Sequence, residues 1–87
     1  MPIWRIPRVM AELGTTRSPT YEQIKAQLLP ATVRIGPRAV GIPSHEVEAV
    51  IKARIAGASD EDIRRLVQRL HLLRKTAAAE LLTGAAK

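Results

Sequence analysis

The fold is decided by residues 13–43, LGTTRSPTYEQIKAQLLPATVRIGPRAVGIP. Gly14 can take the left-handed conformation that commonly follows the last turn of a helix. Ser18 is a typical N-terminal cap, and Pro19 suits the first turn of a helix because its missing N–H is not needed there. Pro30 cannot continue a helix. The stretch therefore predicts a turn after Gly14 and then a helix that Ser18 caps and Pro30 ends.

Helical spacing of apolar residues supports a helix on each side of this turn. Tyr21, Ile24 and Leu28 stand at i, i+3 and i+7, so we expect Tyr21 to lie in the core. A shorter helix precedes Gly14, with Pro7 in its first turn. Its apolar face comprises Val9, Met10 and Leu13. Two short helices joined by a glycine-containing turn are typical of a helix-turn-helix.

A β-hairpin is predicted next. Residues 32–35 and 39–42 are rich in β-branched side chains, and Gly36-Pro37-Arg38 forms a turn between them. Arg38 is therefore expected at the tip of the hairpin. Residues 3–6 have a similar composition, and we expect them to form at most a short strand, in which Trp4 covers the core.

Two more helices are predicted after the hairpin. Ser44 is expected to cap the first, and Gly57 to end it. Its apolar stripe contains Val47, Val50, Ile51 and Ile55. Ser59 is expected to cap the second, with carboxylates at residues 60–62 facing the positive end of the helix dipole. Its apolar stripe contains Ile63, Leu66, Val67, Leu70 and Leu73.

These elements predict a mainly α protein with a small β-hairpin wing, that is, a winged helix-turn-helix. We expect residues 1–58 to form this domain and residues 59–76 to form an amphipathic helix that packs on the domain or on a neighbouring molecule. Residues 77–87 are rich in alanine and are expected to fray. Leucines of the amphipathic helix are candidates for self-association: Leu66, Leu70, Leu72 and Leu73.

Composition excludes several classes of protein. The chain has 87 residues and no cysteine, so a single domain without disulfides or a thiolate metal site is expected. No apolar run approaches the length of a membrane span, and the N-terminus has no signal-peptide core, so we expect a cytoplasmic, nucleoid-associated protein. The two histidines, His45 and His71, lack a third ligand at useful spacing. We expect them in the first turn of a helix and on a solvated helix face, and we expect no metal, cofactor, small-molecule ligand or enzymatic activity.

Charge indicates a polyanionic partner. The formal net charge is +6. Residues 1–44 hold six cations against two anions, a balance of +4, whereas residues 45–87 hold eight cations against six anions, a balance of +2. The first half is therefore the expected binding surface. Only Trp4 and Tyr21 are aromatic, too few for the stacking platforms that single-stranded RNA needs, so duplex DNA is favoured.

A helix-turn-helix with an arginine-tipped hairpin suits duplex DNA. A helix fits the major groove, and a thin hairpin can present Arg38 to the minor groove. Helix side chains off the apolar stripe are candidates for contact: Gln23 and Gln27 with adenine, and Lys25 with guanine or phosphate. Arg17 is a candidate for a phosphate contact at the start of the helix.

The chain resembles the AlpA family of small phage-type regulators over about residues 3–55. The opening of the second helix, LGTTRSPTY at 13–21, matches the family's Arg-Ser-x-x-Tyr pattern. The stretch VRIGPRAVG at 33–41, followed by EVEA at 46–49, resembles the family's wing and next helix. The resemblance implies a MerR-like winged helix-turn-helix without small-molecule sensing. It also implies DNA contacts from Arg17, Ser18, Thr20 and Lys25 of the helix and from Arg34 and Arg38 of the wing.

Two roles follow from the resemblance. The first is a recombination directionality factor, or excisionase, which binds beside an attachment site and favours excision by a separate tyrosine or serine integrase. Copies bound side by side would then contact one another. The second is a transcriptional activator of integrase or excision genes on a prophage or another mobile element. A third alternative, of another class, is a protein-interaction adaptor or antitoxin-like module that uses residues 59–76.

Overall fold

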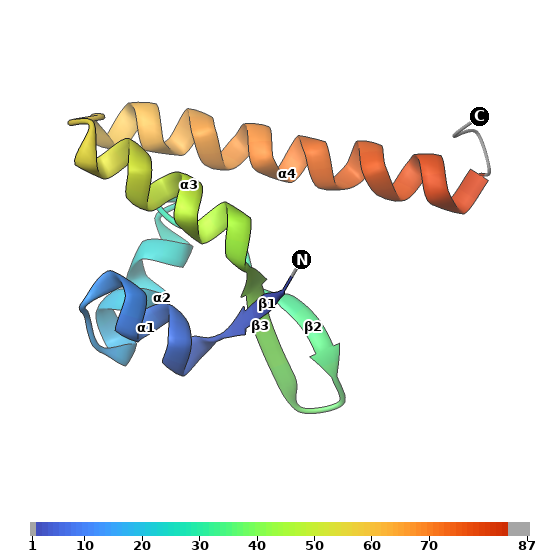
Figure 1. The fold of residues 1–87 in the computed structure, drawn as a ribbon, viewed down its shortest axis with the longest axis horizontal. Helices are drawn as coiled ribbons and strands as arrows, with labels where there is room; N and C mark the ends of the chain where they lie inside the picture. The colour runs from blue at the N-terminus through green and yellow to red at the C-terminus, as the bar shows by residue number, and fades with distance from the viewer. Residues whose placement is uncertain (1, 84–87) are drawn as a thin grey trace.

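A three-stranded antiparallel sheet packs beside a helix-turn-helix, and a long helix crosses on the side away from the hairpin (Figure 1). The computed structural model describes residues 2–83. This arrangement is the predicted winged helix-turn-helix. Its elements are β1 (Ile3–Arg5), α1 (Ile6–Leu13), α2 (Arg17–Lys25), β2 (Val33–Gly36), β3 (Ala39–Pro43), α3 (Ser44–Ile55) and α4 (Asp60–Thr83).

The hairpin is confirmed, and the short N-terminal strand joins it. The strand order is β1-β3-β2, with Trp4 opposite Ile42 and Arg34 opposite Val40. Gly41 allows the strands to approach closely, because a Cβ atom there would lie 2.5 Å from the carbonyl oxygen of Trp4. Arg38 lies in the turn between β2 and β3, at the tip of the wing.

The core lies between the helix-turn-helix, the sheet, α3 and the first half of α4. One buried cluster joins the turn after α2 to α3 and α4, and another joins α1 to β3 and α3. Leu13 and Ile24 pack against both clusters, so the two helices of the helix-turn-helix are fixed to the rest of the body. The first cluster contains Leu29, Val50, Ile63 and Val67, and the second contains Val9, Ile42 and Val47.

The predicted boundaries of α2 were wrong at both ends. Its N-cap is Thr16 rather than Ser18, and it ends at Lys25 rather than beside Pro30. Gln27 has φ 63°, and the N–H of Leu28 donates to the carbonyl oxygen of Gln23 at 2.8 Å. These are features of a left-handed helix C-cap. The early end allows Leu29 to turn inward, where it is fully buried.

One residue of the predicted apolar face of α2 was assigned incorrectly, whereas Ile24 and Leu28 pack against the core as predicted. Tyr21 was expected in the core but is 41% exposed, whereas Thr20 is fully buried. Thr20 can be buried because its hydroxyl donates to the carbonyl oxygen of Thr16 at 2.7 Å. The buried face therefore includes Thr20 in place of Tyr21, and the tyrosine ring is left at the surface.

Two predictions for α3 need correction, and one is confirmed. Pro43 precedes the helix, and Ser44 is its first residue, buried and without a capping hydrogen bond. Ile55 is 81% exposed because the last turn of α3 extends past the core. Gly57 follows the helix with φ 89°, the left-handed conformation expected of the residue that ends it.

The predicted cap of α4 is confirmed, but the predicted tail is wrong. The N–H of Asp62 donates to Ser59 Oγ at 3.1 Å, and the N–H of Ser59 donates to Asp62 Oδ2 at 3.4 Å. The helix continues through residues 77–83, which were expected to fray. Alanine has the highest helix propensity, and the segment contains no residue that breaks a helix. Residues 84–87 of that predicted tail lie outside the described residues.

Candidate nucleic-acid interface

Three arginines from separate elements meet around one shallow depression. Arg5 ends β1, Arg17 begins α2, and Arg38 lies at the hairpin tip. Tyr21 and Val40 are among the other residues that line this depression, which has a volume of about 240 Å³. The fold thus brings together cations that are 12 and 21 residues apart in the sequence.

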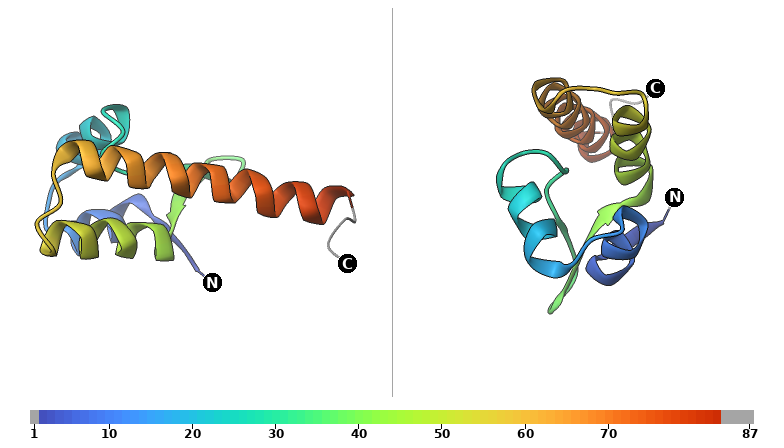
Figure 2. Two further views of the ribbon diagram at one scale, coloured as in Figure 1. Left: turned by 90° about the horizontal axis from the view of Figure 1, so that it is seen from above. Right: turned by 90° about the vertical axis from the view of Figure 1, so that its left-hand side faces the viewer.

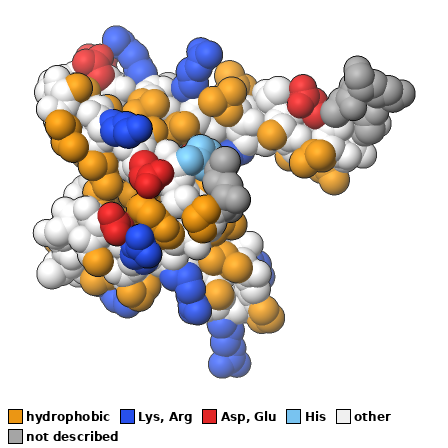
Figure 3. Space-filling model, viewed as in Figure 1, with side chains coloured by type: hydrophobic (Ala, Val, Ile, Leu, Met, Phe, Trp, Pro, Cys, Tyr) orange, Lys and Arg blue, Asp and Glu red, His pale blue; other side chains and the backbone are white. Residues whose placement is uncertain are grey.

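No carboxylate among residues 2–83 forms an ion pair with an arginine of this depression. Within residues 2–83, the ion pairs formed by the second half of the chain involve Arg54, Arg65 and Arg74. Figure 3 shows blue side chains at the tip of the hairpin, at the lower edge of the view. Several cations on or near the helix-turn-helix and the wing make no ion pair with the described residues: Arg5, Arg17, Lys25, Arg34 and Arg38. The face formed by α2 and the hairpin therefore carries several cations that are available to an anionic partner.

The outer face of α2 carries four exposed side chains. Ser18, Tyr21, Glu22 and Lys25 follow one another at i, i+3, i+4 and i+7, so they share one side of the helix. Arg17 is exposed at the start of the same helix. The predicted contacts Arg17, Ser18 and Lys25 are therefore accessible to a ligand.

Three other predicted contacts on this helix do not lie on its outer face. Thr20 is buried, so it cannot reach a ligand. Gln23 is half-buried and lines a different hollow, between α1 and α3. Gln27 is exposed, but it belongs to the turn after α2 rather than to the helix. The side of α2 opposite its outer face packs against the rest of the protein, and the sequence pattern had placed Tyr21 there instead of Thr20.

The wing presents its two predicted arginines. Arg34 pairs across the strands with Val40, and directly opposed side chains project from the same face of a sheet. Val40 lines the depression, so Arg34 lies on the same face of the hairpin. Arg38 is exposed in the turn.

Two residues of the depression, Arg5 and Tyr21, were missed as site residues. The sequence did contain a signal for Arg5. Neighbouring side chains of a strand point to opposite faces, so Arg5 should face outward if Trp4 covers the core. Trp4 does pack against the cluster of Val9, Ile42 and Val47, which confirms that prediction. The guanidinium of Arg8 lies 4.7 Å from the centre of the Trp4 ring.

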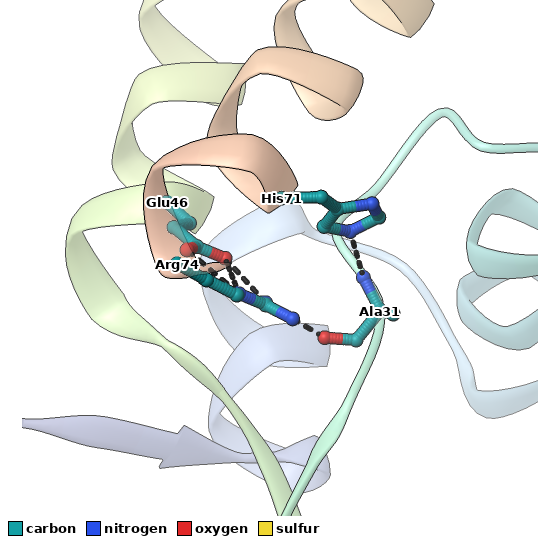
Figure 4. Close-up of polar contacts among 4 residues, drawn as sticks. All are labelled: Ala31, Glu46, His71 and Arg74. Atoms are coloured by element: carbon teal, nitrogen blue, oxygen red, sulfur yellow. Dashed lines mark hydrogen bonds and ion pairs between the residues drawn. The ribbon is translucent and has the colours of Figure 1, made fainter. Parts of the chain in front are cut away.

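A polar cluster that joins α3, α4 and the connection between α2 and β2 was not predicted at all (Figure 4). The Glu46 side chain is 2% exposed and forms an ion pair with Arg74 of α4. Arg74 also donates to the carbonyl oxygen of Ala31 at 2.8 Å, and the N–H of Ala31 donates to His71 Nε2 at 3.0 Å. His71 was expected on a solvated helix face, and that prediction was wrong. Burial, and after it the charge of Arg74, lowers the pKa of His71.

Two of the four leucines proposed for self-association serve the core of this molecule instead. Leu70 is 8% exposed, and Leu66 packs against the buried cluster of Ile63 and Val67. Leu72 and Leu73 remain at the surface, where they are 62% and 52% exposed. Figure 2 shows the second half of α4 extending past α3 and the sheet. Leu81 and Leu82 on that half are also exposed.

Other kinds of site find no support in the part of the chain that the structure describes. No helix within residues 2–83 combines the length and the hydropathy of a membrane span. No group of three or more potential metal ligands occurs within the same residues.

The helix-turn-helix, the three-stranded sheet and the exposed arginine-tipped hairpin define a small winged helix-turn-helix protein. The family described as prophage CP4-57 regulatory protein (AlpA) matches residues 3–55, from β1 to the end of α3. The chain belongs to the AlpA family, a family of prophage regulatory proteins. The comparisons with curated proteins and with solved structures gave no match.

Proposed function

We propose that this protein binds double-stranded DNA with α2 in the major groove and the hairpin against the adjacent minor groove. The observation that carries the proposal is the convergence of Arg5, Arg17 and Arg38, from three elements, around one open depression. Cations that a protein leaves without carboxylate partners are available to phosphates, and each phosphate contact releases counterions.

Five exposed side chains have defined places in this proposal. Arg17 meets a phosphate where α2 enters the groove, and Ser18 and Lys25 face base edges or phosphates. Arg38 enters the minor groove, where the potential is most negative over narrow A-tracts. Glu22 lies among these cations on α2, and it is suited to accept a hydrogen bond from cytosine.

Salt dependence tests the proposal. We expect the affinity for a duplex to fall with a log–log slope of about −4 to −5, as four to six phosphate contacts would give. Fluorescence anisotropy with a labelled duplex over a range of salt concentrations measures this slope. A slope near zero would contradict DNA binding and would favour the adaptor or antitoxin-like alternative.

We further propose that the protein is a recombination directionality factor. In this role it binds several sites beside an attachment site and bends the DNA, so that a separate tyrosine or serine integrase favours excision. Its membership of a family of prophage regulatory proteins supports such a role, and equally supports the alternative role of a transcriptional activator of excision genes. Footprinting separates the two: regularly spaced sites beside an attachment site indicate the first, and a single site in a promoter indicates the second.

Side-by-side contact between copies is proposed to use the second half of α4. This half lies away from α2 and from the tip of the hairpin, so contact there leaves the proposed DNA face free (Figure 1). It overhangs an apolar hollow of about 620 Å³ lined by residues that include Ile3, Val33 and Leu73. The exposed leucines of this half, among them Leu72, are suited to a neighbour's surface.

Leu72→Glu is expected to reduce cooperative binding to DNA that carries several sites and to spare binding to a single site. The side chain is 62% exposed, so the variant should keep its fold by circular dichroism. Electrophoretic mobility shifts on single-site and multi-site duplexes measure the difference. Gln68→Glu is the matched control, because it adds the same charge at an exposed position of α4 without removing a leucine. Equal cooperativity in both variants would exclude Leu72 from the contact.

A further inference from the structure

Helix α4 holds both ends of the connection between α2 and β2. This connection, residues 26–32, contains no helix or strand. At its start, Arg64 Nε donates to the carbonyl oxygen of Ala26 at 3.0 Å. At Ala31, near its end, His71 accepts a hydrogen bond from the backbone N–H, and Arg74 donates one to the carbonyl oxygen.

The clamp at Ala31 is itself anchored in the core. Arg74 Nε donates to Glu46 Oε2 at 2.9 Å, and the Glu46 carboxylate is almost completely buried. Glu46 belongs to α3, whose Val47 packs against Ile42 of the sheet. Figure 4 shows the resulting chain of contacts from Glu46 through Arg74 to Ala31, with His71 beside it. The connection is thus held by α3 and α4 in addition to its covalent links to α2 and β2.

We propose that His71 and Arg74 are positioning residues that fix the spacing between α2 and the hairpin for DNA binding. This inference rests on the proposed function, because it concerns the two elements that would enter adjacent grooves. Both must hold one relative position for simultaneous contact, and residues 26–32 are the segment that joins them. The two positioning residues lie in α4, beyond residue 55, where the match to the AlpA family ends. A helix outside the matched region therefore braces the part of this chain that matches the family.

The contact with Ala31 depends on the protonation state of His71. Nε2 can accept a hydrogen bond only while the imidazole is neutral, with its proton on Nδ1. A protonated ring carries a donor on both nitrogens, so the contact with the Ala31 N–H is lost. Arg74 and Lys75 oppose protonation, as burial does, and Glu46 of α3 favours it. The contact is therefore present at neutral pH and is lost as the pH falls through the lowered pKa of His71.

The test compares duplex affinities of three proteins at about pH 7.5 and at a lower pH at which NMR shows the His71 ring of the unaltered protein to be protonated. His71→Phe keeps a ring but cannot accept the hydrogen bond, so it should bind about threefold to tenfold more weakly than the unaltered protein at the upper pH. The ratio of the affinities of the unaltered protein and His71→Phe should approach one at the lower pH, because the unaltered protein has then lost the contact as well. His71→Gln keeps an acceptor that does not titrate, so it should bind normally at the upper pH and more tightly than the unaltered protein at the lower pH.

The controls separate this inference from the proposed function. His45→Phe, at an exposed position of α3, should show a ratio near one throughout. The positioning role is overturned if His71→Phe and the unaltered protein bind the duplex equally well at neutral pH. It is also overturned if the ratio of their affinities does not change with pH. Neither result contradicts the proposed function. Failure of the unaltered protein to bind any duplex would overturn the proposed function.

If His71→Phe does not fold, NMR of the unaltered protein provides the test instead. The signal of the Ala31 amide and the DNA affinity must then titrate together with the His71 ring. A DNA affinity that does not follow that titration would overturn the inference.

Discussion

Arg38→Ala is expected to weaken duplex binding by about 1–3 kcal/mol, with the largest loss on sites flanked by A·T base pairs. Arg38 is exposed at the tip of the wing and makes no ion pair within residues 2–83. Its guanidinium is therefore free to enter a narrow minor groove, where its loss removes both a charge and directed hydrogen bonds. Titration of labelled duplexes with A·T-rich and G·C-rich flanks measures the effect.

Two control variants test whether the loss of affinity is specific to Arg38. Arg69→Ala removes the same charge from an exposed position on α4, on the side of the molecule away from the hairpin, and should change the affinity little (Figure 1). Lys25→Ala should lose less than Arg38→Ala if Lys25 contacts only phosphate. Equal binding by Arg38→Ala and the unaltered protein would show that the wing supports the fold without touching DNA.

Local patterns in the sequence were sufficient for the order of the elements. The hairpin, its arginine tip and the cap at Ser59 depend on residues within a few positions of one another, and the structure confirms all three. The rotation of α2 depends on what surrounds the helix. Thr20 and Tyr21 both fit a helix, and only packing against α1 and the core decides which of them is buried.

The candidate site was partly predictable, because local sequence patterns position some of its residues. Arg17 and Arg38 follow from their places at a helix start and a turn, and the structure brings them to one depression. Arg5 joins them only because β1 pairs with β3, a contact between segments that are almost 40 residues apart. Gln23 was chosen because it is polar, but its side of α2 faces a hollow lined by α1 and α3.

The polar cluster of Glu46, His71 and Arg74 could not be read from the sequence. Glu46 and Arg74 are 28 residues apart, on two helices whose relative position is a result of folding. The charge count included Glu46 among the six anions of residues 45–87 and gave no sign that its side chain would be only 2% exposed. Burial of a charged group in this way requires a partner, and the partner is visible only in three dimensions.

Arg74→Ala is expected to lower the free energy of unfolding by about 3 kcal/mol. The change leaves the buried Glu46 carboxylate without its cation and removes the donor to the Ala31 carbonyl oxygen. Arg65→Ala, which breaks only exposed ion pairs with Glu61 and Asp62, should cost no more than about 1 kcal/mol. Replacing both partners, with Glu46→Leu and Arg74→Met together, should recover much of the loss, because no charge is then left buried. Denaturant titrations followed by circular dichroism measure all three variants, and equal losses for Arg74→Ala and Arg65→Ala would show that the ion pair with Glu46 contributes no more than a surface pair.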